Sequence, residues 1–377
     1  FKLPQDPPLS QRESRRVLTL RGAKPLAMMA SPPTSAAEAA TVRSPAPTGV
    51  KLGIFLISVA TLLFEVVLTR IFSVVFWYHF AFAAISVGLA GFAISGLVIH
   101  RHRDRLHALI EEGALTYGAL FFQMGAFIAL GFALTAGSGG LMSGPMSLGP
   151  VYIASGLPFF ASGALVAIIL GAWPDEAGRL YAYDLFGAAA GAILALGVLS
   201  VMDAPAAVVM SAVVAGGAAV AFSNKETTFT ASVAMGASLF LLAIQMAFAP
   251  LSVECPKGGC EDGLEAEAWN HFSRVAVFEP QRGARAGISM NYAGPDPISR
   301  PMNIDAAAAT PIFKFDGDLS EVAFLKWDLT SLPYRLRPPK GVFIAGSGGG
   351  PDLLAAQVHG AQTITAAELN PLVVRMA

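Results

Sequence analysis

The C-terminal part of the chain holds the residues best suited to bind a ligand: Gly346, Ser347, Gly348, Gly349, Gly350, Asp352 and Glu368. Glycines let the backbone turn tightly and bring its amide groups close to a bound molecule. Glu368 comes 22 positions after Gly346, and an acidic residue at such a distance binds the hydroxyls of a ribose. The pattern therefore predicts a nucleoside-binding site.

The segments around these glycines have the order strand, turn, helix, strand. Residues 341–345 form a short apolar run, residues 353–359 are helical in pattern, and residues 363–367 form a second strand ending at Glu368. Position 351 is Pro, so the glycines follow G-x-G-x-G rather than G-x-G-x-x-G, which favours an adenosyl ligand related to S-adenosylmethionine over a dinucleotide. We predict that residues 341–377 begin an incomplete Rossmann-like cofactor-binding domain.

The composition places most of the chain in a lipid bilayer. Hydrophobic residues make up 54% and charged residues 14% of the chain, whereas soluble domains carry about 25% charged residues. The net charge of −1 provides no basic surface for nucleic acid.

The chain has two cysteines, Cys255 and Cys260, which are too few for a four-cysteine zinc site. We expect a free pair, or a disulfide if the loop is extracytoplasmic.

Seven apolar runs approach the roughly 20 residues that a helix needs to cross a bilayer. They cover residues 52–76, 79–99, 114–136, 150–172, 180–201, 205–222 and 229–249. We predict a polytopic α-helical membrane domain over residues 51–250, after a disordered tail over residues 1–50 that is rich in Pro, Ser and Ala. Within the fifth run, Gly187 and Gly191 share a helix face and favour close packing against another helix.

Glu65, Arg70 and Asp184 are charged residues inside these apolar runs. Charge in a membrane helix is costly, so it has a partner or a task. Glu65 is expected to pair with Arg70, or with Asp184 or Tyr183 of another helix. Such a pair forms either a polar site or a structural contact that fixes helix packing, and both interpretations remain open here.

The basic residues between the runs indicate the orientation in the membrane. If the loop with Arg101, Arg103 and Arg105 is cytoplasmic, the N-terminal tail, Arg179 and Lys225 lie on the same side. Seven crossings then place the residues after 250 outside. Because an adenosyl cofactor is available in the cytoplasm, we expect the C-terminal domain there. One run must then be re-entrant, or a crossing has been merged or miscounted, and the Gly-rich residues 137–160 are the expected place.

Residues 251–340 have the composition of a soluble β-rich segment. Short stretches such as 272–278 and 311–315 are separated by Gly, Pro and Asp turns, which predicts small antiparallel strands.

Several motifs resemble the bacterial membrane-fused branch of the spermidine synthase (polyamine aminopropyltransferase) superfamily. They are residues 342–356, the Glu-Leu-Asn-Pro at 368–371, the Trp-Asn-x-x-Ser-Arg-Val at 269–275, Asp305 with Thr310-Pro311, and the membrane segments 64–70 and 181–191. The resemblance covers residues 50–377. The Tyr-His-Glu segment of the soluble enzymes is reduced to Tyr334 here.

The resemblance implies a transferase in polyamine biosynthesis that uses S-adenosylmethionine or its decarboxylated form, without a metal. Its glycines, Asp352 and Glu368 would hold the donor, and the acceptor would be a small-molecule amine or a membrane substrate. The alternatives are an S-adenosylmethionine-dependent methyltransferase that acts on a membrane substrate, and a transporter or sensor with a regulatory nucleotide-binding fold. We further expect the chain to be truncated before the catalytic carboxylate, and so inactive in transfer, with the catalytic residue unknown.

Overall fold

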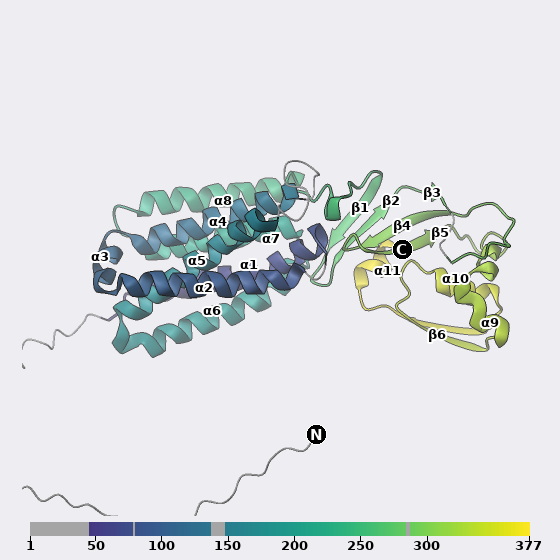
Figure 1. Cartoon of the computed structure of the whole chain (residues 1–377), viewed down its shortest axis with the longest axis horizontal. Helices are drawn as coiled ribbons and strands as arrows, with labels where there is room; N and C mark the ends of the chain where they lie inside the picture. Colours follow the sequence, from purple (N-terminus) through teal and green to yellow (C-terminus); the bar gives the residue numbers. More distant parts are fainter. Residues whose placement is uncertain (1–44, 78–79, 137–147, 284–286) are drawn as a thin grey trace, which may run out of the picture. The chain divides into compact units, whose positions relative to one another are not determined.

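A computed structural model describes residues 45–77, 80–136, 148–283 and 287–377 (Figure 1). Residues 1–44 of the tail predicted over residues 1–50 lie outside the described residues. The predicted boundary at residue 50 is wrong, because the first helix already begins at Thr48.

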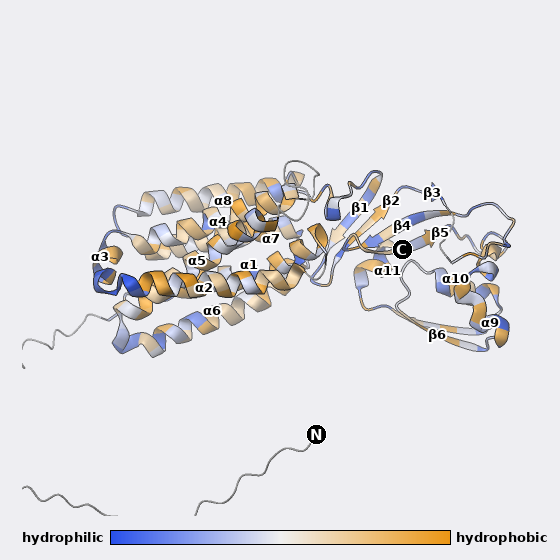
Figure 2. Cartoon of the chain, in the orientation of Figure 1, coloured by the Kyte–Doolittle hydropathy of each residue, from blue (hydrophilic) through white to orange (hydrophobic). Residues whose placement is uncertain are grey.

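Seven apolar helices of the described residues are long enough to cross a membrane, which makes this a multi-pass membrane protein. They are α1 (Thr48–Val75), α2 (Ala81–Arg101), α4 (Ala114–Ala136), α5 (Leu148–Ala172), α6 (Ala177–Val198), α7 (Ala204–Phe222) and α8 (Thr228–Phe248). The seven predicted runs are thus confirmed to within a few residues at each end. Figure 2 shows hydrophobic residues along these helices and a hydrophilic group near the short helix α3 (Leu106–Glu111).

The inner helices α1 and α7 are mostly buried within the protein, whereas α2, α6 and α8 expose most of their apolar side chains. Gly187 and Gly191 of α6 face α1, where an added Cβ would overlap the backbone oxygens of Phe55 and Val59. The predicted close packing at these two glycines is confirmed.

Contacts between distant residues identify the two ends of the bundle. At one end, Lys51 forms an ion pair of 3.1 Å with Glu176, next to the start of α6. At the other, Gln245 near the end of α8 donates to Asp203, directly before α7, with an N–O distance of 3.2 Å.

α5 is one continuous helix of 25 residues. The expected re-entrant segment is therefore not found at residues 148–160, and residues 137–147 lie outside the described part.

A small antiparallel sheet follows the bundle. It contains β1 (Leu264–Trp269), β2 (Arg274–Phe278), β3 (Gln281–Arg282), β4 (Ile298–Ile304) and β5 (Ala308–Phe313), in the order β1-β2-β4-β3, with β5 also paired to β4. The strands predicted within 272–278 and 311–315 correspond to β2 and β5. Val275, Val277 and Met302 form one small core together with Val373 of α11 (Pro371–Met376).

The chain then passes through short helical segments, η6 (Ala323–Trp327), η7 (Leu329–Ser331) and α9 (Leu332–Leu336), to two parallel strands. β6 (Gly341–Ala345) pairs with β7 (Thr363–Ala367), and α10 (Pro351–Val358) connects them. These are the predicted strands and helix. A second core joins α10 to the preceding segments through Phe313, Val322, Phe324, Leu325 and Ala355.

Candidate functional site

The loop between β6 and α10, residues 346–350, is called the glycine loop below. Gly346, Gly348 and Gly350 have φ angles of +77°, +54° and +89°, a region that side-chain-bearing residues rarely adopt. The sequence predicted three positions that need glycine, and the backbone requires it at each. Gly350 directly precedes the first residue of α10, so the loop delivers the chain to a helix N-terminus.

Glu368 lies beside the glycine loop, as the sequence predicted. Its Oε2 accepts a hydrogen bond from the Gly348 amide at 3.1 Å, and its Oε1 accepts one from the Asn370 amide at 3.0 Å. A carboxylate has about four acceptor positions, so each oxygen retains one for a further donor. Two adjacent hydroxyl groups match this remaining capacity.

Strand β5 holds the loop from its other side. The Gly349 amide donates to Thr310 Oγ1 at 3.0 Å, and a Cβ at Gly349 would lie 2.5 Å from Pro311 O. Thr310 and Pro311 belong to one of the motifs that carry the resemblance described above. Their contact with the glycine loop is long-range, and no local pattern in the sequence reveals it.

An open cavity of about 820 Å³ lies in front of the glycine loop. Gly346, Ser347 and Gly348 line it together with Asp352 and Glu368, and so do residues of β5 and Asp328. The sequence had not singled out Asp328, whose Oδ1 accepts hydrogen bonds from the amide and hydroxyl of Thr330, both at 2.9 Å. Three carboxyl groups from separate segments thus border one cavity.

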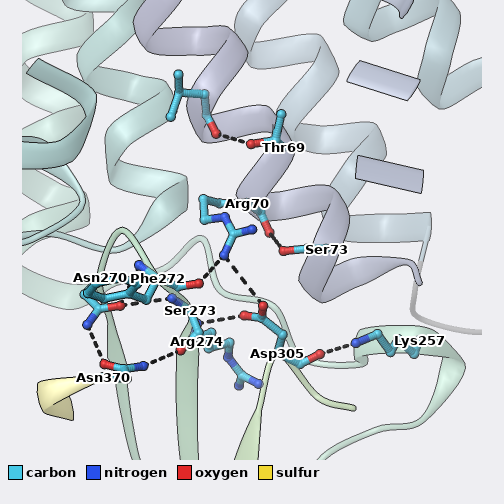
Figure 3. Close-up of polar contacts among 11 residues, drawn as sticks. Thr69, Arg70, Ser73, Lys257, Asn270, Phe272, Ser273, Arg274, Asp305 and Asn370 are labelled. Atoms are coloured by element: carbon cyan, nitrogen blue, oxygen red, sulfur yellow. Dashed lines mark hydrogen bonds and ion pairs between the residues drawn. The ribbon is translucent and has the colours of Figure 1, made fainter. Parts of the chain in front are cut away.

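The three charged residues singled out within the apolar runs, Glu65, Arg70 and Asp184, do not pair with one another. Arg70 turns out of the bundle and donates to the carbonyl of Phe272, and its Nη1 lies 3.6 Å from Asp305 Oδ2 (Figure 3). Asp184 accepts from the Ser58 hydroxyl at 2.5 Å. Glu65 has no hydrogen bond or ion pair with any described residue. The expected pairing of Glu65 with Arg70, Asp184 or Tyr183 is wrong. Arg70, near the end of α1, reaches polar groups outside the bundle, and Asp184 binds Ser58.

Beside Arg70, three buried polar side chains join the turn before β2 to the residue that precedes α11 (Figure 3). Asn270 Nδ2 donates to Asn370 Oδ1, and Asn370 Nδ2 donates to Ser273 Oγ, both at 2.7 Å. Asn270 and Ser273 belong to the Trp-Asn-x-x-Ser-Arg-Val motif, and Asn370 to Glu-Leu-Asn-Pro. The two motifs are therefore in direct contact.

Cys255 and Cys260 form a disulfide after α8. Among the described residues, no group of three or more His, Cys, Asp or Glu side chains could hold a metal ion.

None of the known family models, curated proteins or solved structures matches this chain.

Proposed function

We propose that the chain is a membrane-fused transferase of the spermidine synthase-like type, whose C-terminal Rossmann-like domain binds S-adenosylmethionine or its decarboxylated form. The observation that carries the proposal is the pairing of Glu368 with the glycine loop at the edge of one cavity. Glu368 accepts the ribose hydroxyls, and Gly346 to Gly350 bring the backbone close to the rest of the donor.

The proposed reaction is attack of an acceptor on a carbon beside the donor's sulfonium. A bond forms between the acceptor nitrogen and that carbon, the carbon–sulfur bond breaks, and a neutral thioether leaves. The nitrogen then releases a proton to a carboxylate, and the cavity holds the two reactants close together. A small amine or a membrane substrate is the acceptor, and transfer of a methyl group instead would make the protein a methyltransferase.

Since an adenosyl donor is made in the cytoplasm, we propose that this domain lies in the cytoplasm and that the bundle spans the inner membrane of a bacterium. A second candidate is a transporter or sensor in which the same site binds a regulatory ligand. The basic residues lie at the end of the bundle opposite to the C-terminal domain, and basic residues favour the cytoplasmic side. The disulfide Cys255–Cys260 is also typical of a compartment outside the cytoplasm. Both observations favour this alternative, because they put the C-terminal domain outside the cytoplasm, the compartment in which the adenosyl donor is made.

Binding by the detergent-solubilised protein tests the site. We expect adenosine to compete with a labelled adenosyl donor, and its 2′,3′-dideoxy analogue to compete poorly. Glu368→Gln should weaken adenosine binding by about 1 to 3 kcal/mol, because a charged hydrogen-bond acceptor is lost, and should leave binding of the analogue unchanged. Glu279→Gln is the control, since Glu279 is exposed and outside this cavity. Equal binding of the two nucleosides would contradict the proposed role of Glu368.

A further inference from the structure

A continuous series of polar contacts joins the membrane helix α1 to Glu368. It begins at Arg70, which reaches two acceptors of the C-terminal domain: the carbonyl of Phe272 and the carboxylate of Asp305. The side chains of Arg70 and Asp305 are 23% and 22% exposed, so water screens this ion pair only partly. The guanidinium therefore fixes two separate turns relative to α1.

Both turns are themselves constrained. Asp305 adopts a positive φ of 50°, and its Oδ1 accepts from the amide of Arg274 at 2.8 Å. Asn270 Oδ1 accepts from the amides of Phe272 and Ser273, both at 2.9 Å. A displacement of the Phe272 carbonyl consequently moves the Asn270 side chain.

Asn270 transfers this constraint to the ligand site. Asn270, Ser273 and Asn370 are each less than 10% exposed, and buried polar groups that lose a partner cost about 1 to 3 kcal/mol. Asn370 is held by both other residues. Its own amide donates to Glu368 Oε1, and the other oxygen of Glu368 accepts from Gly348. The last members of the series therefore set the position of the Glu368 carboxylate.

We propose that Arg70 is a positioning residue for the ligand site: through Asn270 and Asn370 it fixes the Glu368 carboxylate, and so couples the membrane bundle to ligand binding. Only the effect of Arg70 on ligand binding rests on the proposed function. Its effect on the position of Glu368 does not, because that position is a property of the protein without ligand. A movement of α1 in the membrane would then alter affinity at the glycine loop.

The first test needs no ligand. Hydrogen exchange of the Gly348 and Asn370 amides is measured in Arg70→Met, and in Asp305→Asn, which keeps an oxygen acceptor for the Arg274 amide. We expect exchange about 2-fold to 30-fold faster in both variants, the range found for residues that transmit coupling. Arg179→Met, an exposed arginine at the opposite end of the bundle, is the control. Unchanged exchange at these two amides in both folded variants would overturn the proposal.

The second test measures adenosine affinity in a double-mutant cycle. Arg70→Met should weaken binding about 2-fold to 30-fold in the wild-type background, and should have little effect when Glu368→Gln is already present. An equal loss in both backgrounds would show that Arg70 acts only through general stability. If the wild type binds no adenosine, the proposed function fails, while the exchange measurement still decides the coupling.

Discussion

The amide of Gly349 donates to the hydroxyl of Thr310 at 3.0 Å, which attaches the glycine loop to strand β5. The two residues are 39 positions apart in the chain. The antiparallel sheet thereby forms one wall of the open cavity and supports the glycine loop that lines it.

Thr310→Val should loosen the loop, because valine has nearly the same shape and cannot accept the hydrogen bond. The unsatisfied amide should cost about 1 to 3 kcal/mol, measured as a lower unfolding temperature and faster exchange at Gly349. Thr365→Val on β7 makes the same chemical change at an exposed position, where the hydroxyl has no hydrogen bond with any described residue, and should be nearly neutral. Equal effects of the two substitutions would rule out the hydrogen bond as the cause.

Gly191→Val should separate α6 from α1, since the added side chain would overlap the backbone of Val59. Overpacking of this kind costs about 1 to 3 kcal/mol. Gly197→Val provides a matched control on the same helix, because no described atom beyond the adjacent residues and backbone of α6 lies within 4 Å of the position of its Cβ. Thermal unfolding in detergent should show a large decrease for the first variant and a small one for the second.

The sequence predicted the membrane helices and the strand–loop–helix–strand segment because both depend on local patterns. Apolar runs of sufficient length define a spanning helix wherever it packs, and three positive-φ glycines mark a tight turn. Glu368 could be placed near the loop because parallel neighbouring strands end at the same edge of a sheet.

The partners of Arg70 and Gly349 could not be predicted in the same way. Arg70 lies in an apolar run, so its spacing from Glu65 suggested an intramembrane pair, whereas its partners Phe272 and Asp305 come from the later domain. Asp328 and Thr310 also join the site through tertiary contacts alone. Such contacts depend on how separate segments pack, which no local periodicity records.

Arg274 should stabilise the antiparallel sheet. Its side chain is fully buried, and its Nη2 lies 2.5 Å from Glu261 and 2.8 Å from Glu267. Burial alone would lower the pKa of Arg274, but hydrogen bonds to these two carboxylates raise it above the usual arginine value. Arg274→Met should cost about 1 to 3 kcal/mol, because it removes the hydrogen bonds of a charged side chain to Glu261 and Glu267, whose side chains are 9% and 24% exposed. Arg300→Met breaks a more exposed pair with Glu265 and should cost at most about 1 kcal/mol.

The stability of the Asp203→Asn variant relative to the wild type should increase as the pH rises above about 4. Burial raises the pKa of Asp203, Glu267 contributes to the increase, and hydrogen bonds from Ala206 and Gln245 oppose it. The folded state therefore binds the proton more tightly than the unfolded state, and wild-type stability falls as pH rises through the folded pKa. Asparagine keeps the helix cap without the charge.

The measurement is the difference in unfolding temperature between this variant and the wild type as a function of pH. Asp318→Asn should show the opposite sign, since hydrogen bonds from Ser320 lower the pKa of Asp318. Its carboxylate stabilises the folded state above the unfolded pKa and loses this effect as pH falls. A pH-independent difference for Asp203→Asn would exclude a raised pKa.

The side of the membrane on which the C-terminal domain lies distinguishes the two candidate functions. A reporter fused after Ala377 should be active in the cytoplasm, because the proposed transferase needs a donor that is made there. The basic residues argue for the reverse: Lys51, Arg101, Arg103, Arg105, Arg179 and Lys225 lie at the other end of the bundle, and such residues favour the cytoplasmic side. A second reporter in the Arg101–Arg105 loop should therefore report the side opposite to the first.

If the fusion after Ala377 is active only outside, and Cys255 and Cys260 are oxidised in cells, the transferase is excluded. The glycine loop and Glu368 would then serve an extracytoplasmic ligand, as in the transporter or sensor.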